Sequence, residues 1–168
     1  MSTKVNATMT YDATCDEVFA MFRDRGYIEQ KVLHTGGTNP DINVKDVGSD
    51  VEITTIRDLP AQVPGFVKSI TGDQVHVVEK ARWSPADDLG ARTAIVTLEF
   101  QGTPSTVRGT LSLHPVPDGS VVEVDFDVKA SVPFVGGKIE GVIAHQMERA
   151  VRQENRVGVA WLTGGPMP

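Results

Sequence analysis

The segment FVGGKIEGVIAHQMERAVRQENRVGVAWL, residues 134–162, decides the fold. Pro133 precedes it and Gly164-Gly165-Pro166 follows it, as is typical of the two ends of a helix. At about 1.5 Å per residue this helix would be about 43 Å long, enough to lie across a whole sheet. Its apolar residues recur at steps of three and four and predict one apolar face: Ile139, Val142, Ile143, Met147, Ala150, Val151, Val157 and Trp161.

Upstream of this helix, apolar and polar residues alternate in a series of short segments. The first strand is predicted at Val5–Tyr11, and loop residues are predicted at 59–69, with an exposed tip around Phe66. Further strands are predicted at residues 42–47, 51–58, 75–83, 93–101, 106–116 and 121–129, separated by Gly- and Pro-rich turns. The alternation indicates an antiparallel sheet with one face covered and the other in water.

Two short helices are predicted between the first strand and the rest of the sheet. Thr14-Cys15-Asp16-Glu17 has the form of a capping box, in which the Thr hydroxyl and the Glu carboxylate bind free backbone N–H groups at the start of a helix. The segment Arg23-Asp24-Arg25-Gly26 is predicted to end that helix, because glycine tolerates the left-handed conformation. A second short helix is predicted from Tyr27 to Thr35. The fold class is therefore α+β, a curved sheet of about seven strands around one long helix. One helix cannot fill the concave side of such a sheet, so either aromatic side chains fill it or a cavity remains.

Length and charge limit the classes of function. The 168 residues predict one domain, residues 1–163, with a short tail at 164–168. A net charge of −6 disfavours a nucleic-acid partner. The single cysteine, Cys15, excludes an intrachain disulfide. Without a signal peptide or an apolar run of membrane-spanning length, the sequence predicts a cytoplasmic protein, either a monomer or a homodimer.

The sequence contains no strong metal or nucleophile motif. Its histidines, His34, His76, His114 and His145, lack metal-ligand spacing, so no metal and no cofactor are predicted. A serine nucleophile elbow is absent, and Cys15 at a helix start is interpreted as an unreactive small residue.

Two carboxylates lie close to apolar faces. Glu79 shares a strand face with Val77 and Trp83, so it either points inward as an anchor or acid/base group, or lies in water at a bulge or edge. Arg57 is a candidate partner. Glu154 lies beside the helix stripe, and we expect it to be solvated and paired with an arginine such as Arg149 or Arg156. Farther from the stripe, the spacing of Glu148 and Arg152 predicts a surface ion pair.

The element order, the strand that runs into TCDEVF at residues 14–19 and the closing helix from Pro133 to Leu162 resemble the START-like superfamily. This superfamily, also called SRPBCC or helix-grip, includes polyketide cyclases and lipid carriers. The chain looks most like an uncharacterised actinobacterial branch, DUF2505. The resemblance covers nearly the whole chain. It implies a hydrophobic cavity between the sheet and the long helix, and no fixed set of catalytic residues.

The candidate ligand-binding residues lie on the inward faces of the predicted elements or at strand ends and loop tips. They are Tyr11, Phe22, Tyr27, Ile53, Phe66, Val77, Glu79, Trp83, Leu98, Phe100, Leu111, Phe126, Ile143 and Met147. Three functions remain open: a carrier or sensor of a hydrophobic small molecule such as a lipid or polyketide, a cyclase- or dehydratase-type enzyme with Glu79 and a pocket tyrosine as acid/base groups, and a ligand-free interaction domain. The carrier leads because apolar faces are extensive and convergent polar groups are scarce.

Overall fold

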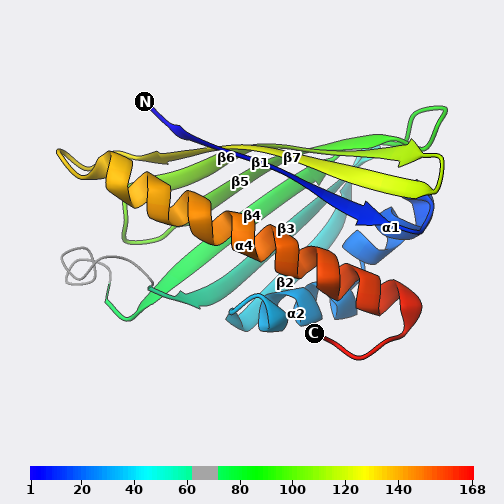
Figure 1. The fold of residues 1–168 in the computed structure, drawn as a ribbon, viewed down its shortest axis with the longest axis horizontal. Helices are drawn as coiled ribbons and strands as arrows, with labels where there is room; N and C mark the ends of the chain where they lie inside the picture. Colours follow the sequence, from blue (N-terminus) through cyan, green and yellow to red (C-terminus); the bar gives the residue numbers. More distant parts are fainter. Residues whose placement is uncertain (62–71) are drawn as a thin grey trace.

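A curved antiparallel sheet wraps around one long helix in the computed structural model, which describes residues 1–61 and 72–168 (Figure 1). Within these residues the order is β1 (Thr3–Tyr11), α1 (Cys15–Phe22), α2 (Arg25–His34), β2 (Thr38–Val47), β3 (Asp50–Pro60), β4 (Gln74–Trp83), β5 (Arg92–Phe100), β6 (Ser105–Val116), β7 (Gly119–Ala130) and α4 (Gly136–Thr163). The predicted α+β class, with two short helices after the first strand and a long C-terminal helix, is confirmed.

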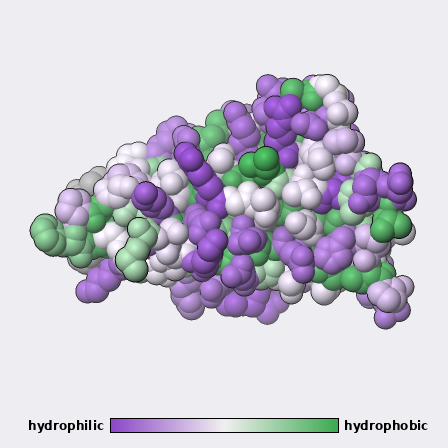
Figure 2. Space-filling model, turned by 90° about the horizontal axis from the view of Figure 1, so that it is seen from above, coloured by the Kyte–Doolittle hydropathy of each residue, from purple (hydrophilic) through white to green (hydrophobic). Residues whose placement is uncertain are grey.

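The sheet has seven strands in the order β1-β7-β6-β5-β4-β3-β2, with every neighbouring pair antiparallel. All neighbours but one follow each other in the chain, and the exception is β1, which pairs with β7. Alternate residues face the helix and are buried, as in β7, where Val122, Val124, Phe126 and Val128 are buried. Seen from the side on which β1, β6 and β7 lie, the surface is mostly hydrophilic, with hydrophobic residues in small separate groups (Figure 2).

Side-chain caps fix the starts of the two short helices. The Thr14 hydroxyl accepts a hydrogen bond from the Glu17 backbone N–H, so the predicted Thr14 cap is confirmed. The Glu17 carboxylate accepts from the Thr14 hydroxyl and, among the described residues, from no backbone N–H, so the capping box is formed only in part. The first helix ends at Phe22 with Arg23 as its C-cap, so the predicted stop is confirmed in position, but the role predicted for Gly26 is wrong. The Asp24 side chain accepts from the backbone N–H of Gly26 and Tyr27, and this cap places both residues in the first turn of α2.

The long helix crosses the concave face of the sheet (Figure 1). It ends at Gly164, whose φ of 69° is left-handed and suits glycine. Near its start, the buried Glu140 carboxylate accepts hydrogen bonds from the Ala130 backbone N–H and the Thr3 hydroxyl, both at 3.0 Å. Near its other end, the Asn155 amide exchanges two hydrogen bonds with the Thr10 backbone. These contacts attach α4 to the β1–β7 side of the sheet.

The strand boundaries differ from the predicted ones mainly in β2 and β3. β2 begins at Thr38, four residues earlier than predicted, and its register with β3 shifts between Thr38 and Asp41. β3 continues to Pro60, into the predicted loop, because pairing with β4 extends to Gln74. Phe66 lies outside the described residues. No helix in the described ranges is long and apolar enough to cross a membrane.

Candidate ligand-binding cavity

A cavity of about 490 Å³ lies between the concave face of the sheet and α4. Strands β1 and β3–β7 supply its floor, and α1, α2 and α4 supply side chains to its walls. Apolar side chains are the majority of the lining: Met9, Phe22, Ile28, Ile53, Leu59, Pro60, Ala81, Trp83, Leu98, Phe100, Leu111, Val124, Phe126, Ile143, Met147, Ala150 and Val151. One helix therefore leaves room against this sheet.

Most of the candidate residues from the sequence meet at this cavity. The lining includes Phe22, Ile53, Glu79, Trp83, Leu98, Phe100, Leu111, Phe126, Ile143 and Met147. They come from α1, from strands β3–β7 and from α4. They line it because strand alternation and the helix stripe direct them toward the same interior space. Their contact with a ligand stays a prediction.

Two tyrosines that were expected in the cavity lie in an aromatic cluster beside it. Tyr11 and Tyr27 are buried, and each ring centroid is about 6 Å from that of Phe22: 6.1 Å for Tyr11 and 6.2 Å for Tyr27. Tyr27 also contacts Trp161 of α4 at 5.9 Å. Because α1 and α2 pack here against α4, aromatic rings close this end of the interior. Aromatic filling and a residual cavity thus occur in different parts of the same core.

Val77 is a third candidate that does not line the cavity. It is fully buried on β4, directly between Arg57 of β3 and Phe100 of β5. Both of these longer neighbours line the cavity, while the shorter valine does not reach it.

Glu79 points inward and forms an ion pair with Arg57. β4 lies between β3 and β5 in regular register, so the alternative of an edge or bulge position is wrong. A guanidinium N–H of Arg57 donates to the Glu79 carboxylate at 2.8 Å, and the two side chains are 13% and 20% exposed. Burial alone would raise the pKa of Glu79, but the charges of Arg57 and Lys31 and the Arg57 hydrogen bond outweigh it and lower the pKa.

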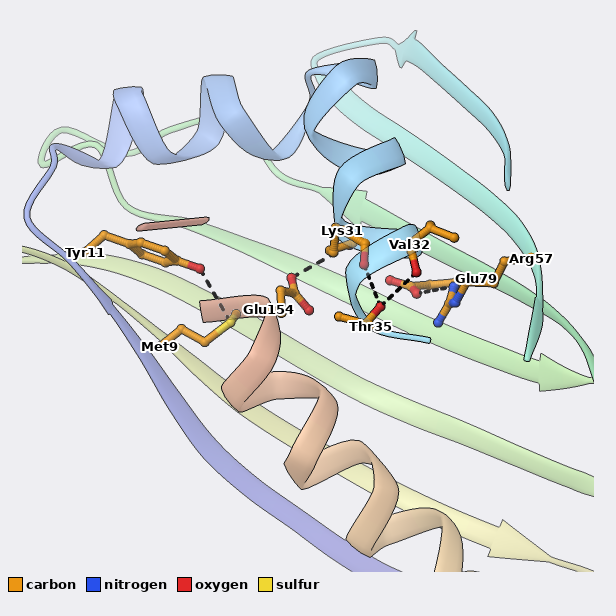
Figure 3. A network of polar contacts seen from close by, with 8 residues as sticks. All are labelled: Met9, Tyr11, Lys31, Val32, Thr35, Arg57, Glu79 and Glu154. Atoms are coloured by element: carbon orange, nitrogen blue, oxygen red, sulfur yellow. Dashed lines mark hydrogen bonds and ion pairs between the residues drawn. The ribbon is translucent and has the colours of Figure 1, made fainter. Parts of the chain in front are cut away.

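Glu154 was expected to be solvated and paired with an arginine, and this expectation is wrong. Its carboxylate lies in the cavity wall, 3.7 Å from the Lys31 ammonium of α2 (Figure 3). Burial, with repulsion from Glu79, raises the pKa of Glu154 despite the opposing charge of Lys31. The cause is the packing of α2 on α4, which brings a lysine close and shields the carboxylate from water.

The two ion pairs lie close together in a cavity whose lining is mostly apolar. Figure 3 shows Arg57, Glu79, Lys31 and Glu154 reaching it from β3, β4, α2 and α4. The charges alternate in sign and balance, which lowers the cost of keeping them out of water. Such a group can anchor a polar substituent of a bound molecule or exchange a proton with it.

Sequence reasoning missed the basic residues around the cavity. Lys31, Arg149, Arg152 and Arg156 all line it, with His34. The arginines follow one another at steps of three and four in α4, which places them along one side of the helix. That spacing was the available signal, but it does not reveal that this side of the helix borders a cavity.

Neither Cys15 nor His145 lines the cavity. Cys15 is buried, and burial raises the pKa of its thiol, which makes the reactive thiolate scarcer. His145 is exposed and does not line the cavity. In residues 1–61 and 72–168, no three His, Cys, Asp or Glu side chains gather in a metal-binding arrangement.

Known proteins resemble the chain over nearly all of its length. An uncharacterised protein of Mycobacterium tuberculosis is 25% identical over 162 residues, which cover 91% of this chain and 92% of the relative. A crystal structure of a Thermus thermophilus protein matches with a TM-score of 0.64 at 13% identity, covering 96% of this chain and 98% of that one.

Two further solved structures share the fold and have descriptive names. A STAR-related lipid transfer protein fragment from Xanthomonas axonopodis has a TM-score of 0.54 at 17% identity, covering 90% of this chain and 83% of that one. The Zhui aromatase/cyclase from Streptomyces sp. R1128 has the same TM-score at 11% identity, with 98% and 93% covered. These likenesses confirm the predicted helix-grip fold.

The family prediction is confirmed as well. Residues 6–162 match the model of a family described as protein of unknown function (DUF2505). That span runs from β1 to the last turns of α4, so it includes every described element that lines the cavity. The chain belongs to the DUF2505 family.

Proposed function

We propose that this protein holds a hydrophobic small molecule between the sheet and α4, as a carrier or sensor. The observation that carries the proposal is the cavity of about 490 Å³ with a mostly apolar lining. Small-molecule sites in proteins have volumes of about 300–1,000 Å³ and combine apolar walls with a few polar groups. The four-charge group of Arg57, Glu79, Lys31 and Glu154 matches the second part of that description.

The solved structures with this fold support the proposal by analogy. One is named as a lipid transfer protein and another as an aromatase/cyclase, and the names imply that each handles a small organic molecule. At 11–17% identity, nothing about their ligands transfers to individual residues of this chain. The alternative of a ligand-free interaction domain would be favoured by a cavity below about 300 Å³, the lower end for ligand sites.

The test is binding of a neutral apolar dye, Nile red, followed by its fluorescence. Ala150 lines the cavity from α4, so Ala150→Phe should fill part of it and weaken dye binding at least about tenfold. Ala20 is exposed on α1 and does not line the cavity, so Ala20→Phe is the matched control and should bind like wild type. Equal loss in both variants, or no binding to wild type, contradicts the proposal.

Native mass spectrometry of protein purified from its own host provides an independent check. A co-purifying apolar molecule that Ala150→Phe loses and Ala20→Phe keeps supports the carrier. Repeated absence of any bound mass speaks against it.

An enzyme of the cyclase or dehydratase type is the second candidate. It is favoured by two carboxyl groups in one cavity, Glu79 and Glu154, whose pKa values are shifted in opposite directions. Incubation of the captured ligand with wild type and with Glu154→Gln distinguishes the two functions. A change in the ligand that only the wild type produces supports catalysis. Unaltered recovery from both supports the carrier.

A further inference from the structure

The cavity is basic although the chain as a whole is acidic. Its lining contains Lys31, Arg57, Arg149, Arg152 and Arg156, five cationic side chains, against two carboxylates. The whole chain has a net charge of −6. Positive charge is therefore concentrated at the site where a small molecule would enter, and it attracts anions there.

Two of the five cations are neutralised within the cavity, and three are not. Arg57 pairs with Glu79, and Lys31 pairs with Glu154. In contrast, Arg149, Arg152 and Arg156 have no carboxylate partner within 4 Å in the part of the chain that the structure describes.

The ion pair expected between Glu148 and Arg152 is not formed among the described residues, although the two residues are one helical turn apart. Arg156 has only a hydrogen bond of 3.4 Å to the neutral Gln153 side chain. These guanidinium groups therefore remain available to an external anion.

The three arginines lie at the boundary between the cavity and water. All three are exposed, and all three also line the cavity. Deeper side chains from the same helix, Ile143 and Val151, are apolar and buried. A molecule that satisfies both regions has an apolar body inside and a negatively charged head at this rim. The guanidinium group suits such a head because its planar donors bind carboxylate and phosphate oxygens in pairs.

We propose that the ligand of this cavity is an amphipathic anion, a carboxylate or phosphate ester with a hydrocarbon body, whose head group is bound by Arg149, Arg152 and Arg156. This inference rests on the proposed function and specifies its ligand class. A long polyanion fits less well, because the arginines border a concave apolar site on one side and the rest of the chain is acidic.

The experiment compares molecules with one tail and different heads. Dodecanoate and dodecyl phosphate, each below its micelle-forming concentration, and dodecanol, below its solubility limit, compete with Nile red for the wild-type protein. At least one anion should displace the dye at a concentration about tenfold or more below that of dodecanol, as expected for a charge-assisted hydrogen bond at a partly exposed site. Added salt should weaken the anion and leave the alcohol unchanged.

Two double variants test whether the arginines at the boundary of the cavity cause the preference for an anion over the alcohol. In Arg149→Gln/Arg152→Gln, the anion should lose most of its advantage while dodecanol competes as before. The control is Arg108→Gln/Lys138→Gln, which removes two exposed cations outside the cavity, one of them on α4, and should keep the preference. All four substituted residues are exposed, so these variants are expected to fold.

The outcomes separate the anionic ligand from the cavity function. The anionic ligand is overturned if dodecanol and both anions compete equally, or if Arg149→Gln/Arg152→Gln keeps the anion preference. Either result leaves the cavity function intact. Failure of Nile red to bind wild type overturns both. Preference for only one of the two anions identifies the head group.

Discussion

The ion pair between Arg57 and Glu79 yields a sharp prediction about stability. Replacing one partner of a fully buried pair costs about 3–5 kcal/mol, because the other charge stays buried and unpaired. An exposed pair is worth about 0–1 kcal/mol. With side chains 13% and 20% exposed and Lys31 still near Glu79, this pair lies between those limits. Arg57→Met should therefore lower the free energy of unfolding by about 2 kcal/mol at neutral pH, or Tm by about 4–8 °C for a chain of this length.

Urea denaturation provides the measurement, and pH separates the charge effect from lost packing. The pKa of Glu79 is lowered in the folded state, so the pair stabilises the fold above the unfolded value near 4.5, and this contribution is lost as pH falls through the folded pKa. The cost of Arg57→Met should therefore shrink in acid. Arg57→Met/Glu79→Gln should be more stable than Arg57→Met alone, because no unpaired carboxylate remains.

Arg82 and Asp50 provide the matched control. Their ion pair has the same length, 2.8 Å, but its side chains are 47% and 30% exposed. Arg82→Met should cost less than about 1 kcal/mol. If Arg57→Met is no more costly than this control, or if its cost is the same at all pH values and unchanged by Glu79→Gln, the reasoning about the buried pair is refuted.

Three further predictions concern α4. A Cβ on Gly158 would lie 2.7 Å from the Tyr11 ring, so Gly158→Ala should lower the free energy of unfolding by about 1–2 kcal/mol in urea denaturation. At Gly141 a Cβ would meet nothing within 4 Å, so Gly141→Ala should stabilise the protein by up to about 1 kcal/mol. Equal effects of the two substitutions would contradict the close packing at Gly158. Glu140→Ala leaves the Ala130 N–H buried without its acceptor and should cost about 2 kcal/mol in the same assay, and a cost below about 0.5 kcal/mol would show that this bond contributes little. Because the pKa of Glu154 is raised in the folded state, its stabilising contribution is complete below about 4.5 and is lost as pH rises. Glu154→Gln should therefore gain stability relative to wild type as pH rises above about 4.5 in the same assay, and a constant difference would contradict the raised pKa.

Local patterns in the sequence were sufficient to predict most of the fold. The alternation in β7 and the apolar stripe of α4 each follow from side-chain directions that a strand or helix imposes regardless of its partners. The same rule predicted that Glu79 shares the inward face of β4 with Trp83. The start of α2 was misplaced because the Asp24 cap outweighs the helix-ending tendency of Gly26.

Prediction of the site would have required the contacts between helices and strands, which patterns within one element do not show. Lys31 approaches Glu154 only because α2 docks on α4, and no spacing within either helix encodes that contact. The same docking places Tyr27 against Trp161 and away from the cavity. Arg149 and its two companions were visible as a basic stripe, yet their role depends on which side of α4 faces open space. Short-range patterns determine which face is apolar, while packing determines where the interior stays empty.

The pairing of β1 with β7 has a consequence for synthesis on the ribosome. Partners on this side of the sheet are separated by as many as 125 residues, as in the contact of Ser2 with Asp127. At about 5–20 residues per second, the nascent chain waits about 6–25 seconds between the emergence of one partner and the other. During that interval Val5 and Met9, which are buried in the folded protein, lack their partners in β7. β1 is therefore the segment that a holding chaperone would protect until β7 has emerged and pairs with it.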